Sequence, residues 1–236
     1  NEAAIASARR DEKVISQLQI LDSIEKVMLG PERKGRAISD KEKKMTAYHE
    51  AGHALVAASL KDADPVQKVS IVSRGMAGGY TLKLPLEEQR LKTKKQFMAD
   101  LAVALGGYTS EQATFGDIST GSSNDIKEAS EMARRIVTHY GMSEKLGPIS
   151  FGKQSDMIYL GREITAEKNY SETTAKEKDE EVSTFMRRAQ DTAKRIVTSR
   201  KKALAAVANK LLEKENLEQE EFNEVLRPFK LKLIAL

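Results

Sequence analysis

Residues 39–65 read SDKEKKMTAYHEAGHALVAASLKDADP, and the rest of the chain is interpreted outward from this stretch. Ser39 and Glu42 form a capping-box pattern, which predicts that a helix begins near residue 40. The following positions are mostly apolar or alanine as far as Leu60. A polar segment and Pro65 then follow, where a helix does not easily continue. The sequence therefore predicts one long helix that is largely buried.

Two histidines stand four positions apart in this helix, as His49-Glu50-Ala51-Gly52-His53. Residues at this spacing lie only about 40° apart around a helix, so both imidazoles can reach one ion. The pattern H-E-x-x-H is typical of helices that bind zinc, with the glutamate as general base. The alternative is a helix with two incidental histidines. We interpret His49 and His53 as metal ligands and Glu50 as the catalytic base.

Composition limits the classes of protein to consider. The 236 residues are 40% hydrophobic and 31% charged, which indicates a globular chain with a substantial core. The net charge of +4 is interspersed and aromatic residues are only 5%, so nucleic-acid binding is not expected. There is no cysteine, so a transition metal must be held by histidine and carboxylate side chains.

The ends and hydropathy of the chain give two further expectations. No apolar run approaches the roughly 20 residues that cross a bilayer, and no signal peptide precedes the first helix, so we expect the chain as given to be soluble. The first residue is Asn rather than Met. We therefore expect a processed or partial product rather than a complete gene product.

Hydrophobic periodicity predicts a mainly α fold (α+β) with a small β-sheet. Two strands are expected to pair antiparallel, because their apolar and polar positions alternate or they carry β-branched residues, and a glycine-rich segment joins them. A domain boundary is expected near residue 34, in a polar connector that follows Gly30-Pro31. The predicted helices cover 2–10, 16–29, 40–60, 93–105 (ended by Gly106-Gly107), 124–140 and all of 171–227, and the predicted strands cover 66–72 and 80–84.

A catalytic zinc site needs a third protein ligand besides His49 and His53. Val56 and Ser59 occupy the positions where one class of zinc protease has its glycine and third histidine. Three candidates remain, namely Glu111, which lies 58 residues beyond His53, Asp125 near the start of a helix, and His139, the one remaining histidine. The residues alone divide the choice evenly between Glu111 and Asp125. His139 is interpreted as a helix C-terminal residue that interacts with the helix dipole.

Three stretches together resemble a known family. They are Tyr48-His49-Glu50-Ala51-Gly52-His53-Ala54, Ser119-Thr120-Gly121-Ser122-Ser123-Asn124-Asp125-Ile126 and Tyr140-Gly141-Met142-Ser143-Glu144-Lys145-Leu146-Gly147-Pro148. In this order they are similar to the FtsH family of membrane-anchored, ATP-dependent zinc proteases. The resemblance extends from Asn1 to about Leu226. It selects Asp125 as the third ligand to Zn²⁺, beside His49 and His53.

The resemblance also implies a domain organisation and a set of partners. Residues 1–34 correspond to the last helices of an ATPase lid plus a linker, and residues 35–236 to a zincin-type zinc metallopeptidase domain. ATP would be used only by an ATPase domain that this chain lacks. The family implies a homo-hexamer with protein substrates, tethered through segments absent from this chain to the cytoplasmic face of a bacterial inner membrane or the organellar equivalent.

The function expected from this sequence is zinc-dependent cleavage of peptide bonds in unfolded or membrane-extracted proteins, as the proteolytic part of an ATP-dependent protease that serves protein quality control. The strand expected at 79–84 offers an edge to which an extended substrate can add through main-chain hydrogen bonds. The alternative is a non-catalytic, metal-stabilised oligomerisation module. Glu50 argues against that alternative, because a structural zinc site has no use for a general base.

Overall fold

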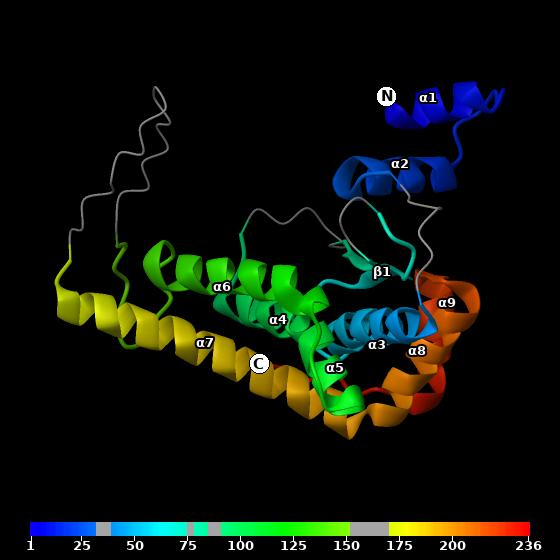
Figure 1. The fold of residues 1–236 in the computed structure, drawn as a ribbon. Helices are drawn as coiled ribbons and strands as arrows, with labels where there is room; N and C mark the ends of the chain where they lie inside the picture. Colours follow the sequence, from blue (N-terminus) through cyan, green and yellow to red (C-terminus); the bar gives the residue numbers. More distant parts are fainter. Residues whose placement is uncertain (32–38, 75–77, 85–90, 152–169) are drawn as a thin grey trace.

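The computed structural model describes residues 1–31, 39–74, 78–84, 91–151 and 170–236. Helices dominate these residues, and one small antiparallel sheet lies against them (Figure 1). The predicted fold class, mainly α with a small sheet, is therefore confirmed. The polar connector predicted after Gly30-Pro31, at residues 32–37, lies outside the described residues.

Helix α3 (Asp40–Ala57) occupies the middle of the molecule, as the capping pattern predicts. The Ser39 side chain accepts a hydrogen bond from the backbone N–H of Glu42 at 3.2 Å. From His49 to Ala57 every residue of the helix is buried, against helices that come from far along the chain. These are α4 (Lys94–Ala104), α5 (Gly106–Phe115), α7 (Glu172–Ser199) and α8 (Lys201–Lys214). The helix that bears the histidines is thus held rigidly on several sides.

The sheet has the strand order β2-β1-β3, and both pairs are antiparallel. Strands β1 (Val66–Ser70) and β2 (Tyr80–Lys83) are the predicted pair. Strand β3 (Asn216–Glu218) lies within the segment predicted to be wholly helical, so that prediction is wrong at these three residues. Leu217 of β3 pairs with Val69 and is fully buried. A three-residue strand has too little alternation to be recognised, and its partner on β1 is about 150 residues away in sequence.

Gly106 and Gly107 were expected to end a helix, and α4 does end at Ala104, just before them. They also begin α5, where they let two helices approach closely. A Cβ on Gly106 would lie 2.8 Å from the carbonyl oxygen of Gly52 in α3, and a Cβ on Gly52 would overlap the Gly106 carbonyl oxygen. Gly52, the glycine of the H-E-x-x-H segment, therefore allows the close approach of α3 and α5.

Helix α6 (Ser123–Thr138) packs on α4 and α7, and a short 3₁₀ turn, Thr120–Ser122, precedes it (Figure 1). The chain continues from α8 through β3 into α9 (Gln219–Leu226) and a final 3₁₀ turn, Arg227–Phe229. The backbone of Lys61 and Ser59 bonds with Ile234, so the C-terminal segment returns to the end of α3. The C-terminal segment therefore packs beside the end of the central helix.

The two N-terminal helices, α1 (Glu2–Arg9) and α2 (Gln17–Leu29), form as predicted and lie apart from the helical body, on the side of the sheet (Figure 1). Helix α2 is attached to the sheet through Glu25, which is 2% exposed. Its carboxylate lies 2.9 Å from Lys68 Nζ and 3.2 Å from Arg74, and it accepts a hydrogen bond of 2.7 Å from the Tyr80 hydroxyl. Among the described residues, none of the helices has the length and apolar character needed to cross a membrane.

Candidate metal centre

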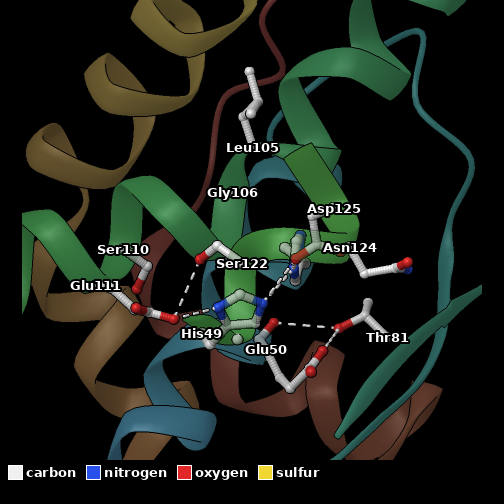
Figure 2. A network of polar contacts seen from close by, with 12 residues as sticks. His49, Glu50, Thr81, Leu105, Gly106, Ser110, Glu111, Ser122, Asn124 and Asp125 are labelled. Atoms are coloured by element: carbon white, nitrogen blue, oxygen red, sulfur yellow. Dashed lines mark hydrogen bonds and ion pairs between the residues drawn. The ribbon is translucent and has the colours of Figure 1, made fainter. Parts of the chain in front are cut away.

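Three side-chain atoms converge at the middle of α3. The Nε2 atoms of His49 and His53 lie 3.0 Å apart, and Asp125 Oδ2 lies 3.0 Å from the first and 3.3 Å from the second. Figure 2 shows Asp125 beside the His49 ring. Both histidines are buried, whereas Asp125, in the first turn of α6, is partly exposed. The structure thus brings together the three residues that the sequence analysis named as metal ligands.

The other ring nitrogen of each histidine has its own acceptor. His49 Nδ1 lies 2.6 Å from Glu111 Oε1, and His53 Nδ1 lies 2.7 Å from the backbone carbonyl of Val103. With each Nδ1–H donating to these oxygens, each neutral imidazole presents the lone pair of Nε2 to the common point. Metal-binding histidines are oriented in this way in proteins.

The donor set and its spacing fit a zinc ion. Zinc bonds to imidazole nitrogen and carboxylate oxygen are about 2.0–2.2 Å long, so ligands in a tetrahedron are about 3.3 Å apart. The three observed separations, 3.0, 3.0 and 3.3 Å, are close to this value. Three protein ligands leave one position for water or substrate, which is typical of catalytic rather than structural zinc.

The electrostatics of the cluster favour a cation. Burial opposes a charge on His49, but its hydrogen bonds with Asp125 and Glu111 outweigh this and raise its pKa to about 10. Burial likewise opposes the charge on Asp125, yet the two histidines hold the pKa of that carboxyl well below its ordinary value. The carboxylates of the site therefore favour positive charge at the histidines. A divalent cation bound there would be stabilised by the same charges.

Glu111, the other candidate for third ligand, lies on the opposite side of the His49 ring from Asp125 (Figure 2). It is 1% exposed, and its second carboxylate oxygen accepts the backbone N–H of Ser119 at 2.6 Å. It therefore contacts both His49 and the loop that leads to Asp125. His139, the remaining histidine, is exposed at the end of α6 and is not part of the cluster.

Glu50 is 6% exposed, and burial raises the pKa of its carboxyl above the ordinary value. Its Oε2 accepts a hydrogen bond of 2.9 Å from Thr81 Oγ1 on β2. Sequence reasoning did not identify Thr81 or the carbonyl of Val103, because one hydroxyl in a strand and one backbone oxygen in a helix have no distinguishing sequence pattern.

Gly107 provides the space for the His49 ring. A Cβ at this position would overlap the imidazole, so any side chain larger than hydrogen would displace the ring. Gly107 thus lies in the wall of the site. Like Gly52 and Gly106, Gly107 is a position between α3 and α5 where a side chain does not fit.

The cluster lies in a cleft of about 1010 Å³. Strand β2 and the residue before it form one wall, and the start of α6 and the preceding turn form another. The volume is at the upper end of the range for small-molecule pockets, and the cleft is partly open.

Two helical histidines, an adjacent buried glutamate and a distant aspartate define a site of the metallopeptidase class. Comparison with known proteins agrees with this class, since residues 36–225 match the sequence model of "Peptidase family M41". The chain therefore belongs to peptidase family M41.

Relatives among curated proteins are similar over nearly the whole chain. An "ATP-dependent zinc metalloprotease FtsH 1" of Thermomicrobium roseum is 52% identical over 221 residues, and one of Sphaerobacter thermophilus is 49% identical over 221 residues. Each alignment covers 94% of this chain and 34% of the relative. A protein of Chloroflexus aggregans, "ATP-dependent zinc metalloprotease FtsH", is 47% identical over 98% of this chain and 36% of its own length. The chain thus spans about a third of the length of these relatives.

Proposed function

We propose that this chain is the peptidase part of an ATP-dependent zinc endopeptidase, with His49, His53 and Asp125 as metal ligands and Glu50 as general base. The observation that carries the proposal is the convergence of two Nε2 atoms and one carboxylate oxygen within 3.3 Å, beside a buried glutamate. The names of the relatives, which are zinc metalloproteases, support the choice of metal.

Each residue of the site has a distinct task. When bound, zinc supplies a Lewis acid that polarises the substrate carbonyl and lowers the pKa of water. Glu50 accepts the proton of the attacking water and returns it to the nitrogen of the leaving amine. Its raised pKa suits a group that must both take and release a proton near neutral pH.

Glu111 has a supporting role in this proposal. It holds Nδ1 of His49, which fixes the tautomer and the orientation of the ring, and it ties the Ser119 backbone in place before Asp125. Of the two residues between which the sequence alone left the choice open, we propose Asp125 as the ligand and Glu111 as its supporting residue. The proposal rests on their positions on opposite sides of the His49 ring.

The substrate is proposed to be an unfolded or membrane-extracted protein. Strand β2 lies at one edge of the sheet and, among the described residues, pairs only with β1. An extended peptide that adds to this edge is held through main-chain groups, which makes binding tolerant of sequence. Residues of β2 also line the cleft that holds the proposed metal ligands, so a peptide on this edge would lie beside them.

The remaining parts of the proposal rest on the relatives, which are about three times longer than this chain. Residues 1–34 would close an ATPase lid and form a linker, residues 35–236 would be the peptidase domain, and the family match that starts at residue 36 supports this boundary. The proposal also includes a homo-hexamer and the use of ATP by a separate domain. It further includes a tether to the cytoplasmic face of a bacterial inner membrane or its organellar equivalent.

A Glu50→Gln variant tests the catalytic proposal against a purely structural role for the metal. Wild type and variant are compared for bound zinc and for cleavage of unfolded casein. We expect both proteins to bind zinc and only the wild type to cleave. Cleavage by Glu50→Gln at the wild-type rate would refute the assigned base. Zinc binding by the wild type without any cleavage would instead favour the non-catalytic oligomerisation module.

A further inference from the structure

The strand beside the cleft also contacts the proposed base. Along β2 the side chains alternate, so that Tyr80 and Leu82 are buried on one face while Thr81 and Lys83 share the other. Thr81 pairs with Val69 of β1, which fixes its position along the strand. From there its hydroxyl reaches Glu50 on α3 (Figure 2).

The Thr81 hydroxyl has two acceptors within reach, and one is clearly favoured. Its Oγ1 lies 2.9 Å from Oε2 of Glu50 and 3.3 Å from the backbone carbonyl oxygen of the same residue. That carbonyl is inside α3, where it already accepts the N–H of the next turn. A hydroxyl has one proton to donate, and a carboxylate is the stronger acceptor. The contact therefore acts on the carboxylate.

Two contacts from the beginning of β2 act on the Glu50 side chain. Among the residues that the structure describes, Thr81 is the only one whose side chain hydrogen-bonds it. Gly79, just before the strand, packs against the same side chain, since a Cβ there would lie 2.9 Å from both Cγ and Oε1 of Glu50. The beginning of β2 thus sets the orientation of Glu50 by one close packing contact and one hydrogen bond.

We propose that Thr81 is a positioning residue, which holds one oxygen of the Glu50 carboxylate so that the other faces the cleft for proton transfer. The proposal rests on the proposed role of Glu50 as base. Because β2 is also the proposed docking edge, the strand that receives the substrate backbone would hold the base as well. The position of the proton acceptor is then tied to the position of the peptide bond.

Thr81→Val and Thr81→Ser form a matched pair for the test, since valine keeps the shape without the hydroxyl and serine keeps the hydroxyl. Cleavage of an unstructured fluorogenic peptide is measured together with bound zinc and thermal unfolding. We expect Thr81→Val to lower kcat about tenfold, the equivalent of one hydrogen bond, with KM, zinc content and melting temperature unchanged. Thr81→Ser should restore most of kcat. Crystal structures should show the Glu50 carboxylate in more than one orientation in the valine variant alone.

The outcomes separate this proposal from the function on which it rests. An unchanged kcat in Thr81→Val, with Glu50→Gln inactive, would overturn the role of Thr81 and leave Glu50 as the base. Loss of zinc or of thermal stability in proportion to the loss of kcat would show a merely structural residue and overturn the proposal too. Wild-type activity in Glu50→Gln would refute the assigned base, which is the part of the proposed function on which the role of Thr81 rests. If Thr81→Val does not fold, Thr81→Ala against Thr81→Ser gives the same comparison.

Discussion

His49 lies between two carboxylates, with Asp125 at 3.0 Å from its Nε2 and Glu111 at 2.6 Å from its Nδ1. The His49 imidazole therefore contacts both Asp125, the proposed third ligand, and Glu111, the other candidate for that position. His53 lies on the same side of the His49 ring as Asp125, with its Nε2 3.0 Å from Nε2 of His49. The two acidic residues are consequently expected to differ in what their removal does to metal binding.

The first prediction concerns Glu111. Glu111→Ala removes the acceptor of His49 Nδ1 and the partner of the Ser119 backbone, so the His49 ring loses its fixed orientation. Groups that orient a metal ligand typically contribute about 10–100-fold to affinity, and we expect a loss in this range. Glu111→Gln, which keeps an acceptor oxygen, should lose less. Competition with a chromogenic chelator measures the affinities, and equal affinity in wild type and Glu111→Ala would contradict the role assigned to this residue.

A second prediction concerns the contact between α3 and α5. Alanine is normally the better residue inside a helix, by about 1 kcal/mol over glycine. At Gly52, however, a Cβ would overlap the Gly106 carbonyl and lie 2.5 Å from the Ser110 Cβ. We expect Gly52→Ala to lower the free energy of unfolding by about 1–3 kcal/mol, as overpacked cores do. Urea denaturation measures it.

Gly78→Ala is the control for that substitution, because a Cβ at Gly78 has no heavy atom of the described residues within 4 Å. Its unfolding free energy should stay within about 0.5 kcal/mol of wild type. Equal stability of Gly52→Ala and Gly78→Ala would show that the two helices can move apart at little cost, against the close packing described above.

The third prediction concerns alkaline pH and the contact of α2 with the sheet. Burial and the hydrogen bond to Glu25 raise the pKa of Tyr80 to about 12. Burial opposes the charge on Lys68, but its pairing with Glu25 and Glu218 raises the pKa of that amine as well. Both groups hold their protons more tightly when folded than when unfolded. Their stabilisation is therefore complete below about pH 10 and is lost as the pH rises toward 12.

We expect the free energy of unfolding to fall steeply between pH 10 and 12 in the wild type, and less steeply in Glu25→Gln, which weakens the contacts of both groups. Denaturant titrations at several pH values measure the slope. Lys26→Gln is a suitable control on the same helix, since its pair with Glu2 lies at the surface. An identical alkaline slope in wild type and Glu25→Gln would contradict the proposed linkage.

Local patterns predicted much of this molecule because they depend on neighbours in sequence. The capping residue Ser39 and the spacing of His49 and His53 specify a helix and a pair of facing imidazoles without knowledge of the rest of the chain. Antiparallel pairing of the first two strands was also visible, because their residue pattern and the glycine-rich connection are typical of such a pair.

Features that depend on distant contacts could not be predicted from the residues alone. The choice between Asp125 and Glu111 depends on which nitrogen of the His49 ring each approaches, and only the family resemblance favoured Asp125 in advance. Strand β3 exists because Leu217 completes the sheet beside Val69. Gly106 and Gly107 were interpreted as a helix end, whereas their lack of side chains serves the approach to Gly52 and the space for the His49 ring.

The most direct test of the central claim is the zinc content of the wild type beside Asp125→Ala, Glu111→Ala and His139→Ala after dialysis. The geometry predicts one zinc ion per chain in the wild type and in His139→Ala, weakened binding in Glu111→Ala, and loss of zinc from Asp125→Ala. Full zinc content in Asp125→Ala together with its loss from Glu111→Ala would contradict the account.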